Sequence, residues 1–169
     1  MSGMLKAVVA AMAVLAAPGA AAAQVWTEWT EAEGRALMAA ENGVVTEVEI
    51  VDGELRLYGI IDDWFHVGLY GSDCSGVGAK LTCTALGLNA LFEVDDAARS
   101  QALQAEMDFR YVADVADGQD LIIHRQVELE GGASLPNIRA QVNGFVVVGE
   151  LVRDKIWPPK GDADPAKAD

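Results

Sequence analysis

The chain has 169 residues, of which 51% are hydrophobic, 12 are Lys or Arg and 26 are Asp or Glu, so its net charge is −14. A surface this acidic repels phosphate backbones and anionic lipids, which disfavours binding to nucleic acid or adhesion to membranes. The length suits one domain with a hydrophobic core and is too short for two domains that each have a core of their own.

Residues 1–23 have the anatomy of a cleavable export signal. Lys6 supplies a positive n-region, an apolar run follows it, and an alanine-rich stretch offers small residues for cleavage. Cleavage near Ala23 would leave 11 basic and 26 acidic residues, a net charge of −15. An uncleaved anchor is the alternative, but the apolar run is far shorter than the roughly 20 residues that span a bilayer. We therefore expect a periplasmic or secreted protein with no stable membrane insertion after cleavage.

Cys74 and Cys83 are the only cysteines. An even count in an exported chain favours a disulfide, and Gly76 and Gly78 between them let the chain fold back. We expect a Cys74–Cys83 bridge that stabilises the fold by about 2–3 kcal/mol through loop closure. The alternative is a reduced, packed pair. A redox role is disfavoured because the spacing is not Cys-x-x-Cys.

The first element predicted after the signal is a helix from Glu31 to about Glu41. Thr30 and Glu33 have the spacing of a capping box, in which each side chain accepts a hydrogen bond from the other residue's backbone. The apolar stripe of this segment ends at Asn42-Gly43, a typical helix stop.

Four strands are predicted to follow. Segments rich in β-branched and aromatic residues lie at 44–51, 54–60, 64–70 and 79–86. The first two flank Asp52-Gly53, a dipeptide that favours a two-residue type I′ hairpin turn. The loop between the last two carries Cys74.

A second helix and a second hairpin are predicted next. Asp95-Asp96 precedes a helix that runs through Met107, and Asp117-Gly118 separates strands at 109–116 and 119–130. In the later strand Leu121, Ile123, Val127 and Leu129 share one face, and Ile122, His124, Gln126 and Glu128 share the other. One covered face and one wetter face are typical of an antiparallel sheet.

The last predicted helix begins at Ser134 with Pro136 just inside and runs to about Asp154. Its apolar stripe is wider than one sheet face needs, because Val147, Val148 and Leu151 extend it. The surplus either joins the core or forms a contact face for a homodimer or an apolar partner. Residues 157–169 offer nothing to bury, so we expect a disordered tail.

The order of helix, four strands, helix, two strands and helix predicts an α+β fold, an antiparallel sheet with helices packed on one face. Residues 24–156 are expected to form this domain, between the signal peptide at 1–23 and the tail.

No constellation of residues predicts catalysis, a cofactor or a metal. The two histidines, His66 and His124, lie in different hairpins, and neither has a motif around it. Close His or Cys spacing of the kind that holds zinc is absent from the sequence. The stretch Gly76–Lys80 departs from the order of a phosphate-binding loop.

Several segments of the second half resemble a known family. Asp117-Gly118-Gln119-Asp120-Leu121, the stretch Glu128–Ser134 with its paired glycines, and Asn137-Ile138 before an apolar helix are similar to the YbjN family of bacterial sensory transduction regulators. The resemblance extends over about Thr30 to Ile156. It implies a fold like that of the type III secretion chaperones, and it implies no catalytic residues, since none are defined for the family.

The leading expectation is therefore a non-enzymatic, exported binding or regulatory module, a sensory transduction regulator or chaperone-like domain. It would contact a protein or peptide through its sheet face or its last helix. The alternative is a small periplasmic hydrolase that uses His66 or His124 beside a carboxylate and a hydroxyl. A third interpretation is an envelope protein with a purely structural role.

Overall fold

The computed structural model describes residues 24–107, 112–116 and 119–158. Within them, six antiparallel strands form one sheet in the order β2-β3-β4-β5-β7-β6, and a separate pair joins β1 to β8. In chain order the elements are β1 (Val25–Trp26), α1 (Glu31–Ala40), β2 (Gly43–Val51), β3 (Glu54–Ile61), β4 (Phe65–Ser75), the 3-10 turn η1 (Gly78–Lys80), β5 (Thr82–Phe92), α2 (Ala97–Met107), β6 (Val112–Ala116), β7 (Asp120–Glu128), β8 (Ala133–Ser134) and α3 (Leu135–Ile156). This is the predicted α+β class. The predicted signal peptide, residues 109–111 of the strand predicted at 109–116, the predicted turn at Asp117-Gly118 and residues 159–169 of the predicted tail lie outside the described residues.

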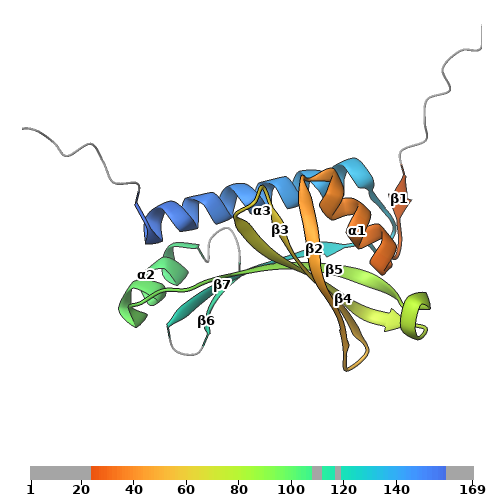
Figure 1. Ribbon diagram of the computed structural model, residues 1–169, viewed down its shortest axis with the longest axis horizontal. Helices are drawn as coiled ribbons and strands as arrows, with labels where there is room; N and C mark the ends of the chain where they lie inside the picture. The colour runs from red at the N-terminus through yellow and green to blue at the C-terminus, as the bar shows by residue number, and fades with distance from the viewer. Residues whose placement is uncertain (1–23, 108–111, 117–118, 159–169) are drawn as a thin grey trace, which may run out of the picture.

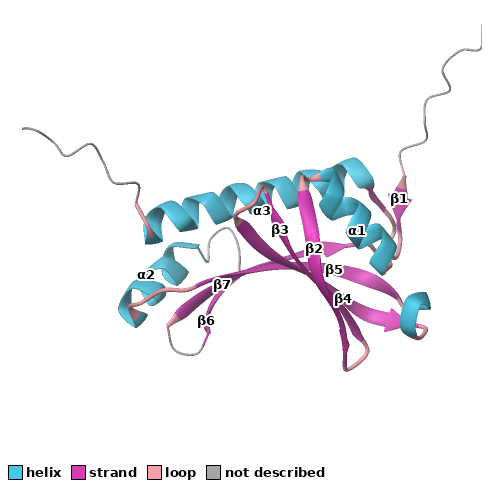
Figure 2. Ribbon diagram, viewed as in Figure 1, coloured by secondary structure: helices cyan, strands magenta, loops and turns pink. Residues whose placement is uncertain are grey.

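The helices gather on one side of the sheet. Figure 1 shows α3 running across the sheet on the same side as α1, with α2 at the end formed by β6 and β7. The opposite side of the sheet is covered by none of the described α-helices (Figure 2). One face of the sheet therefore packs in the core, and the other faces solvent.

Local sequence signals set the first helix and the first hairpin as predicted. Thr30 accepts a hydrogen bond from the Glu33 amide, and the Glu33 carboxylate accepts one from the Thr30 amide at 2.9 Å, which completes the capping box. Asp52 and Gly53 both have positive φ, 53° and 84°, the backbone that a type I′ turn requires. The turn fixes the register in which β2 pairs with β3.

Two strands are longer than the sequence pattern predicts. β4 continues through Cys74 to Ser75, and β5 runs from Thr82 to Phe92 instead of covering 79–86. Residues 78–80 form a 3-10 turn, so the prediction of a strand beginning at 79 was wrong. β5 continues past Leu86 because Leu88 and Phe92 keep pointing into the core while β7 supplies backbone partners.

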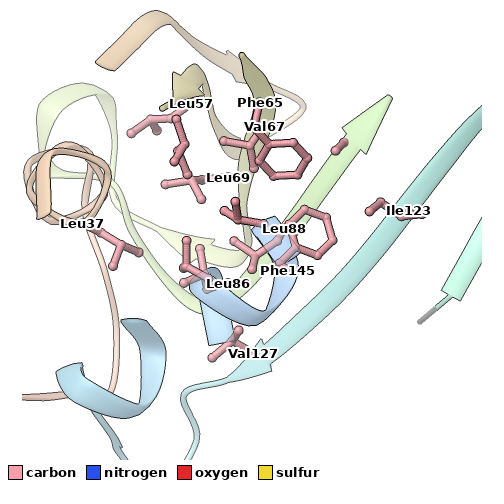
Figure 3. Close-up of a cluster of buried hydrophobic side chains, with 14 of the residues drawn as sticks. Leu37, Leu57, Phe65, Val67, Leu69, Leu86, Leu88, Ile123, Val127 and Phe145 are labelled. Carbon is pink, nitrogen blue, oxygen red and sulfur yellow. The ribbon is translucent and has the colours of Figure 1, made fainter. Parts of the chain in front are cut away.

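The core lies between the helix side of the sheet and α3 (Figure 3). Phe145 of α3 meets Phe65 of β4 with ring centroids 5.8 Å apart, and both rings are buried. Gly149 lies against the same ring, because a Cβ built on it would fall 2.2 Å from Phe65 Cε2. The lack of a side chain at this position brings α3 close to β4. The α3 side chains buried in the core are Ile138, Val142, Phe145, Val146, Val148, Val152 and Ile156.

Two arginines, Arg139 and Arg99, form contacts between the helices. Arg139 of α3 forms an ion pair with Glu41 at the end of α1 and donates a hydrogen bond to the Ala40 carbonyl at 2.9 Å. Arg99 of α2 donates to the carbonyls of Lys155 and Ile156, which belong to the last turn of α3. These contacts satisfy carbonyls that helix ends leave without an intrahelical partner.

Candidate binding face of the sheet

The sheet side opposite the helices carries a mixture of aromatic and polar side chains. Burial alternates along β3, so Arg56 and Tyr58 point away from the core that Leu55 and Leu57 enter. Strand pairing places residues of the other strands beside them on the same side. We call this surface the open face; it comprises Glu47, Glu49, Arg56, Tyr58, Ile60, His66, Gly68, Tyr70, Ser72, Gly87, Asn89, Leu91, Asp114, Ile122, His124, Gln126 and Glu128.

Four residues from three strands meet at the centre of the open face, and we call them the tyrosine cluster: Arg56, Tyr58, Tyr70 and Asn89. Arg56 and Tyr70 are directly opposed in the sheet, and the guanidinium carbon of Arg56 lies 5.7 Å from the centroid of the Tyr70 ring. The Tyr58 and Tyr70 rings meet edge to face, with centroids 6.1 Å apart. Such cation–π and edge-to-face contacts each favour a fixed ring orientation.

Ionisation within this cluster is shifted in definite directions. Burial raises the pKa of the Tyr70 hydroxyl; hydrogen bonding to Asn89 opposes the shift and hydrogen bonding to Tyr58 adds to it. The hydrogen bond that Arg56 donates to Glu54, at 2.9 Å, raises the pKa of the guanidinium. Arg56 thus stays charged, and its charge is already paired with Glu54.

Glycine makes the close packing of this cluster possible. A Cβ on Gly68 would fall 2.3 Å from Asn89 Oδ1 and 2.6 Å from Tyr70 Cε2. The Asn89 amide and the Tyr70 ring therefore lie over the bare backbone of Gly68. Their positions are set by the sheet, so a ligand would not have to order them.

Two adjoining hollows flank the cluster, and Tyr70 and Asn89 border both of them. One, of about 420 Å³, lies towards β7 and is also bordered by Gly87, His124 and Gln126. The other, of about 320 Å³, lies towards β3 and also touches His66 and Leu91. Their volumes fall at the lower end of the range of ligand sites.

The two histidines of the hydrolase alternative both lie on the open face, each in a different hollow. His124 Nε2 lies 3.5 Å from Asp114 Oδ2, and both side chains are solvent-accessible. Within the described residues, neither imidazole hydrogen-bonds to a hydroxyl. His124 therefore has a carboxylate neighbour, but the third group that a nucleophilic mechanism needs is not held beside it.

The acidic doublets Asp62-Asp63 and Asp95-Asp96 lie in a turn and just before a helix. Asp62 and Asp63 have positive φ, 49° and 62°, in the turn between β3 and β4. Asp96 Oδ1 accepts a hydrogen bond from the Ala98 amide at 2.9 Å at the start of α2. Across the described residues, no group of three or more His, Cys, Asp or Glu side chains is placed to hold a metal ion.

The predicted disulfide is present and joins Cys74 of β4 to Cys83 of β5. The two residues are directly opposed in the sheet, so the bridge ties adjacent strands near one end. Cys83 is fully buried beside Trp29, whose indole nitrogen donates to the Ala85 carbonyl at 2.9 Å. The bridge therefore lies beside Gly71, with Cys83 in the core, and supports the fold.

The proposed contact face of the last helix is smaller than the sequence predicts. Val147 and Leu151 are 53% and 49% exposed, but Val148 is only 6% exposed and belongs to the core. Val148 is thus unavailable to a partner, because the helix turns it towards the sheet. Val147 and Leu151, one helical turn apart, remain on the outer side of α3.

Sequence reasoning did not identify the tyrosine cluster. Its only local signal is the alternation in β3 that places Arg56 and Tyr58 on the face opposite Leu55 and Leu57. Tyr70 and Asn89 join them through strand pairing, which the sequence does not specify residue by residue.

Comparison with protein-family models, curated proteins and solved structures finds no match to this chain. Among the described helices, none has the length and hydropathy to cross a membrane.

Proposed function

We propose that this protein is a non-enzymatic binding or regulatory module of the cell envelope that contacts a protein or peptide through its open face. The observation that carries the proposal is the tyrosine cluster, in which the strands hold aromatic and amide side chains in place away from the core. Tyrosine and arginine are enriched at protein interfaces. The resemblance to the YbjN family supports a regulatory role in the same direction.

The outer side of α3 is the weaker candidate for the contact surface. Val147 and Leu151 are half-exposed, but neither borders one of the two hollows. A patch of two half-exposed apolar side chains is small for an interaction site. The hydrolase alternative also has less support, since the carboxylate of Asp114 is the one catalytic partner that His124 has among the described residues.

Site-specific photocrosslinking in the native envelope tests the proposal. Benzoylphenylalanine replaces Leu91 on the open face in one variant and Val147 on α3 in another; the two positions are 54% and 53% exposed, which makes them matched probes. We expect a discrete adduct with another polypeptide from the Leu91 position only. Adducts from the Val147 position alone would move the contact to α3. No adduct from either position would contradict a binding module.

A further inference from the structure

The larger hollow has a floor without a side chain. Tyr70, Gly87 and Gln126 lie in one row across β4, β5 and β7, because Tyr70 pairs with Gly87 and Gly87 pairs with Gln126. A Cβ built on Gly87 would meet only Tyr70, at 3.5 Å or more, which is ordinary contact. The backbone of Gly87 is therefore exposed as a flat strip between Tyr70 on one side and the side chains of His124 and Gln126 on the other.

The wall on the β4 side is a ring held in place. Arg56 lies on the β3 side of Tyr70, and Tyr58 meets the Tyr70 ring edge to face. The Tyr70 ring lies over Gly68, and the Tyr70 atoms nearest Gly87 are its Cβ and carbonyl oxygen, so Tyr70 borders the hollow along its β4 side. A second ring entering the hollow could pack against it at little cost in side-chain ordering.

The groups around the hollow select an uncharged occupant. Asn89 and Gln126 each offer an amide with donors and an acceptor. Arg125, which also borders the hollow, directs its side chain to Gln141 of α3, at 3.2 Å, on the helix side of the sheet. The described lining includes no carboxylate to hold a cation, and the acidic chain repels anions.

We propose that this hollow is the anchor site for a tyrosine or tryptophan side chain presented by the partner. The inference rests on the proposed function and adds which side chain the open face selects. The partner's ring packs against Tyr70 above Gly87, and its phenol or indole edge hydrogen-bonds to Asn89 or Gln126. Tyrosine and tryptophan fit because each combines an apolar ring with one polar group.

Titration of the isotope-labelled protein with capped tripeptides tests the anchor site directly. The central residue is Tyr, Trp, Leu or Glu between two glycines, and backbone amide shifts are followed by NMR. We expect the aromatic peptides to shift the amide signals of Gly87, Asn89 and Gln126. The leucine peptide should bind roughly two- to ten-fold more weakly, the range that aromatic pairing adds beyond burial, and the glutamate peptide more weakly still.

Gly87→Val supplies the structural control. The added side chain has room and suits a strand, so this variant should keep its melting temperature while covering the floor of the hollow. We expect it to lose the shifts caused by the aromatic peptides, whereas Val147→Ala on α3 keeps them. Unchanged binding by Gly87→Val, or equal binding of the tyrosine and leucine peptides, would overturn the proposal.

A neutral sugar, methyl β-glucoside, is titrated in parallel. If the sugar shifts the same signals and the aromatic peptides do not, the hollow is a sugar site and the anchor proposal is wrong. If no tripeptide binds while the Leu91 position still cross-links to a partner, the anchor proposal fails and the proposed function stands. Failure of both experiments would reject both.

Discussion

At the scale of single residues, Tyr70 connects the open face to the pH dependence of stability. Burial raises the pKa of its hydroxyl above the ordinary value of about 10. At high pH the unfolded chain then loses this proton before the folded chain does. Because the unfolded state binds fewer protons there, the free energy of unfolding falls as the pH rises above about 10 and through the folded-state pKa.

Tyr70→Phe should remove this part of the pH dependence, since phenylalanine cannot ionise. We expect the free energy of unfolding in urea to fall less between pH 8 and pH 10.5 in the variant than in the wild type. At pH 8 the variant should be less stable by about 0.5–1.5 kcal/mol, because the hydroxyl's hydrogen bonding is lost. An equal pH slope in the two proteins would show that Tyr70 is not responsible.

Gly149 is a helix residue at which the addition of one methyl group should destabilise the fold. In an ordinary helix Gly→Ala is stabilising by roughly 1 kcal/mol. Here the new methyl group would overlap the buried Phe65 ring, and overpacking of this kind costs about 1–3 kcal/mol or more. We therefore expect Gly149→Ala to lower the free energy of unfolding in urea melts.

A second substitution distinguishes steric overlap from a helix effect. Phe65→Leu shortens the ring that Gly149 faces, so the double variant should be more stable than the sum of the two single effects predicts. If the losses in free energy of unfolding simply add in the double variant, steric overlap between position 149 and Phe65 is not the cause.

At the scale of the elements, the ion pair between α3 and α1 should matter more than its exposure suggests. Glu41 is only 7% exposed and its carboxylate accepts from Arg139. Arg139→Ala leaves a mostly buried carboxylate without its cation and the Ala40 carbonyl without its donor. We expect a loss of about 1–2 kcal/mol in the free energy of unfolding, measured by urea denaturation.

Arg35→Ala is the matched control for this prediction. Arg35 also pairs with a glutamate, Glu31, at 2.7 Å, but both side chains are exposed and belong to one helix. Exposed pairs of this type contribute only about 0.3–0.5 kcal/mol. Similar losses in the two variants would mean that the burial of Glu41 has no energetic consequence.

Elements whose ends are set by neighbouring residues were the predictable ones. The capping box at Thr30 starts α1 and the Asp52-Gly53 turn joins β2 to β3, as expected. The far ends of β4 and β5 were not predictable in this way. They extend to Ser75 and Phe92 because each strand has partners across the sheet, and such pairing is absent from a local pattern.

The same reason explains why the candidate site was missed. Arg56 and Tyr58 read individually as solvent-facing residues of a strand, and Asn89 lies beyond the end predicted for its strand. Only the register of β3, β4 and β5 brings them to Tyr70. The sequence therefore predicts which face of a strand is exposed to solvent. It does not predict which of the exposed residues contact one another across the sheet.

At the scale of the whole molecule, the two sides of the sheet differ in what covers them. α3 contributes buried side chains along its length and leaves only Val147, Leu151 and Trp157 as large exposed apolar residues on described positions of the helix and its cap. The open face lacks such a cover but has ordered aromatic and amide groups. The fold thus leaves one surface of the sheet without a helix cover while its core stays buried.

The disulfide links the stability of this fold to the redox state of its surroundings. Cys74 and Cys83 close a short loop between adjacent strands, and loss of such a bridge costs about 2–3 kcal/mol. We expect the Cys74→Ala/Cys83→Ala double variant to melt roughly 5–12 °C below the wild type, with the measurement made by circular dichroism. Dithiothreitol should lower the melting temperature of the wild type towards that of the variant and leave the variant unchanged.

Export should decide whether the bridge forms, because disulfides persist in oxidising compartments. When the full chain is expressed, we expect an exported form without residues 1–23 whose thiols resist alkylation by a maleimide. When the chain is expressed from Gln24 in a reducing cytoplasm, both thiols should react once the protein is unfolded. An intact mass that retains residues 1–23 would contradict the predicted signal, and reactive thiols in the exported form would contradict the bridge. Without the bridge, the stability of the protein must come from its buried core and from helix contacts such as those of Arg139 and Arg99.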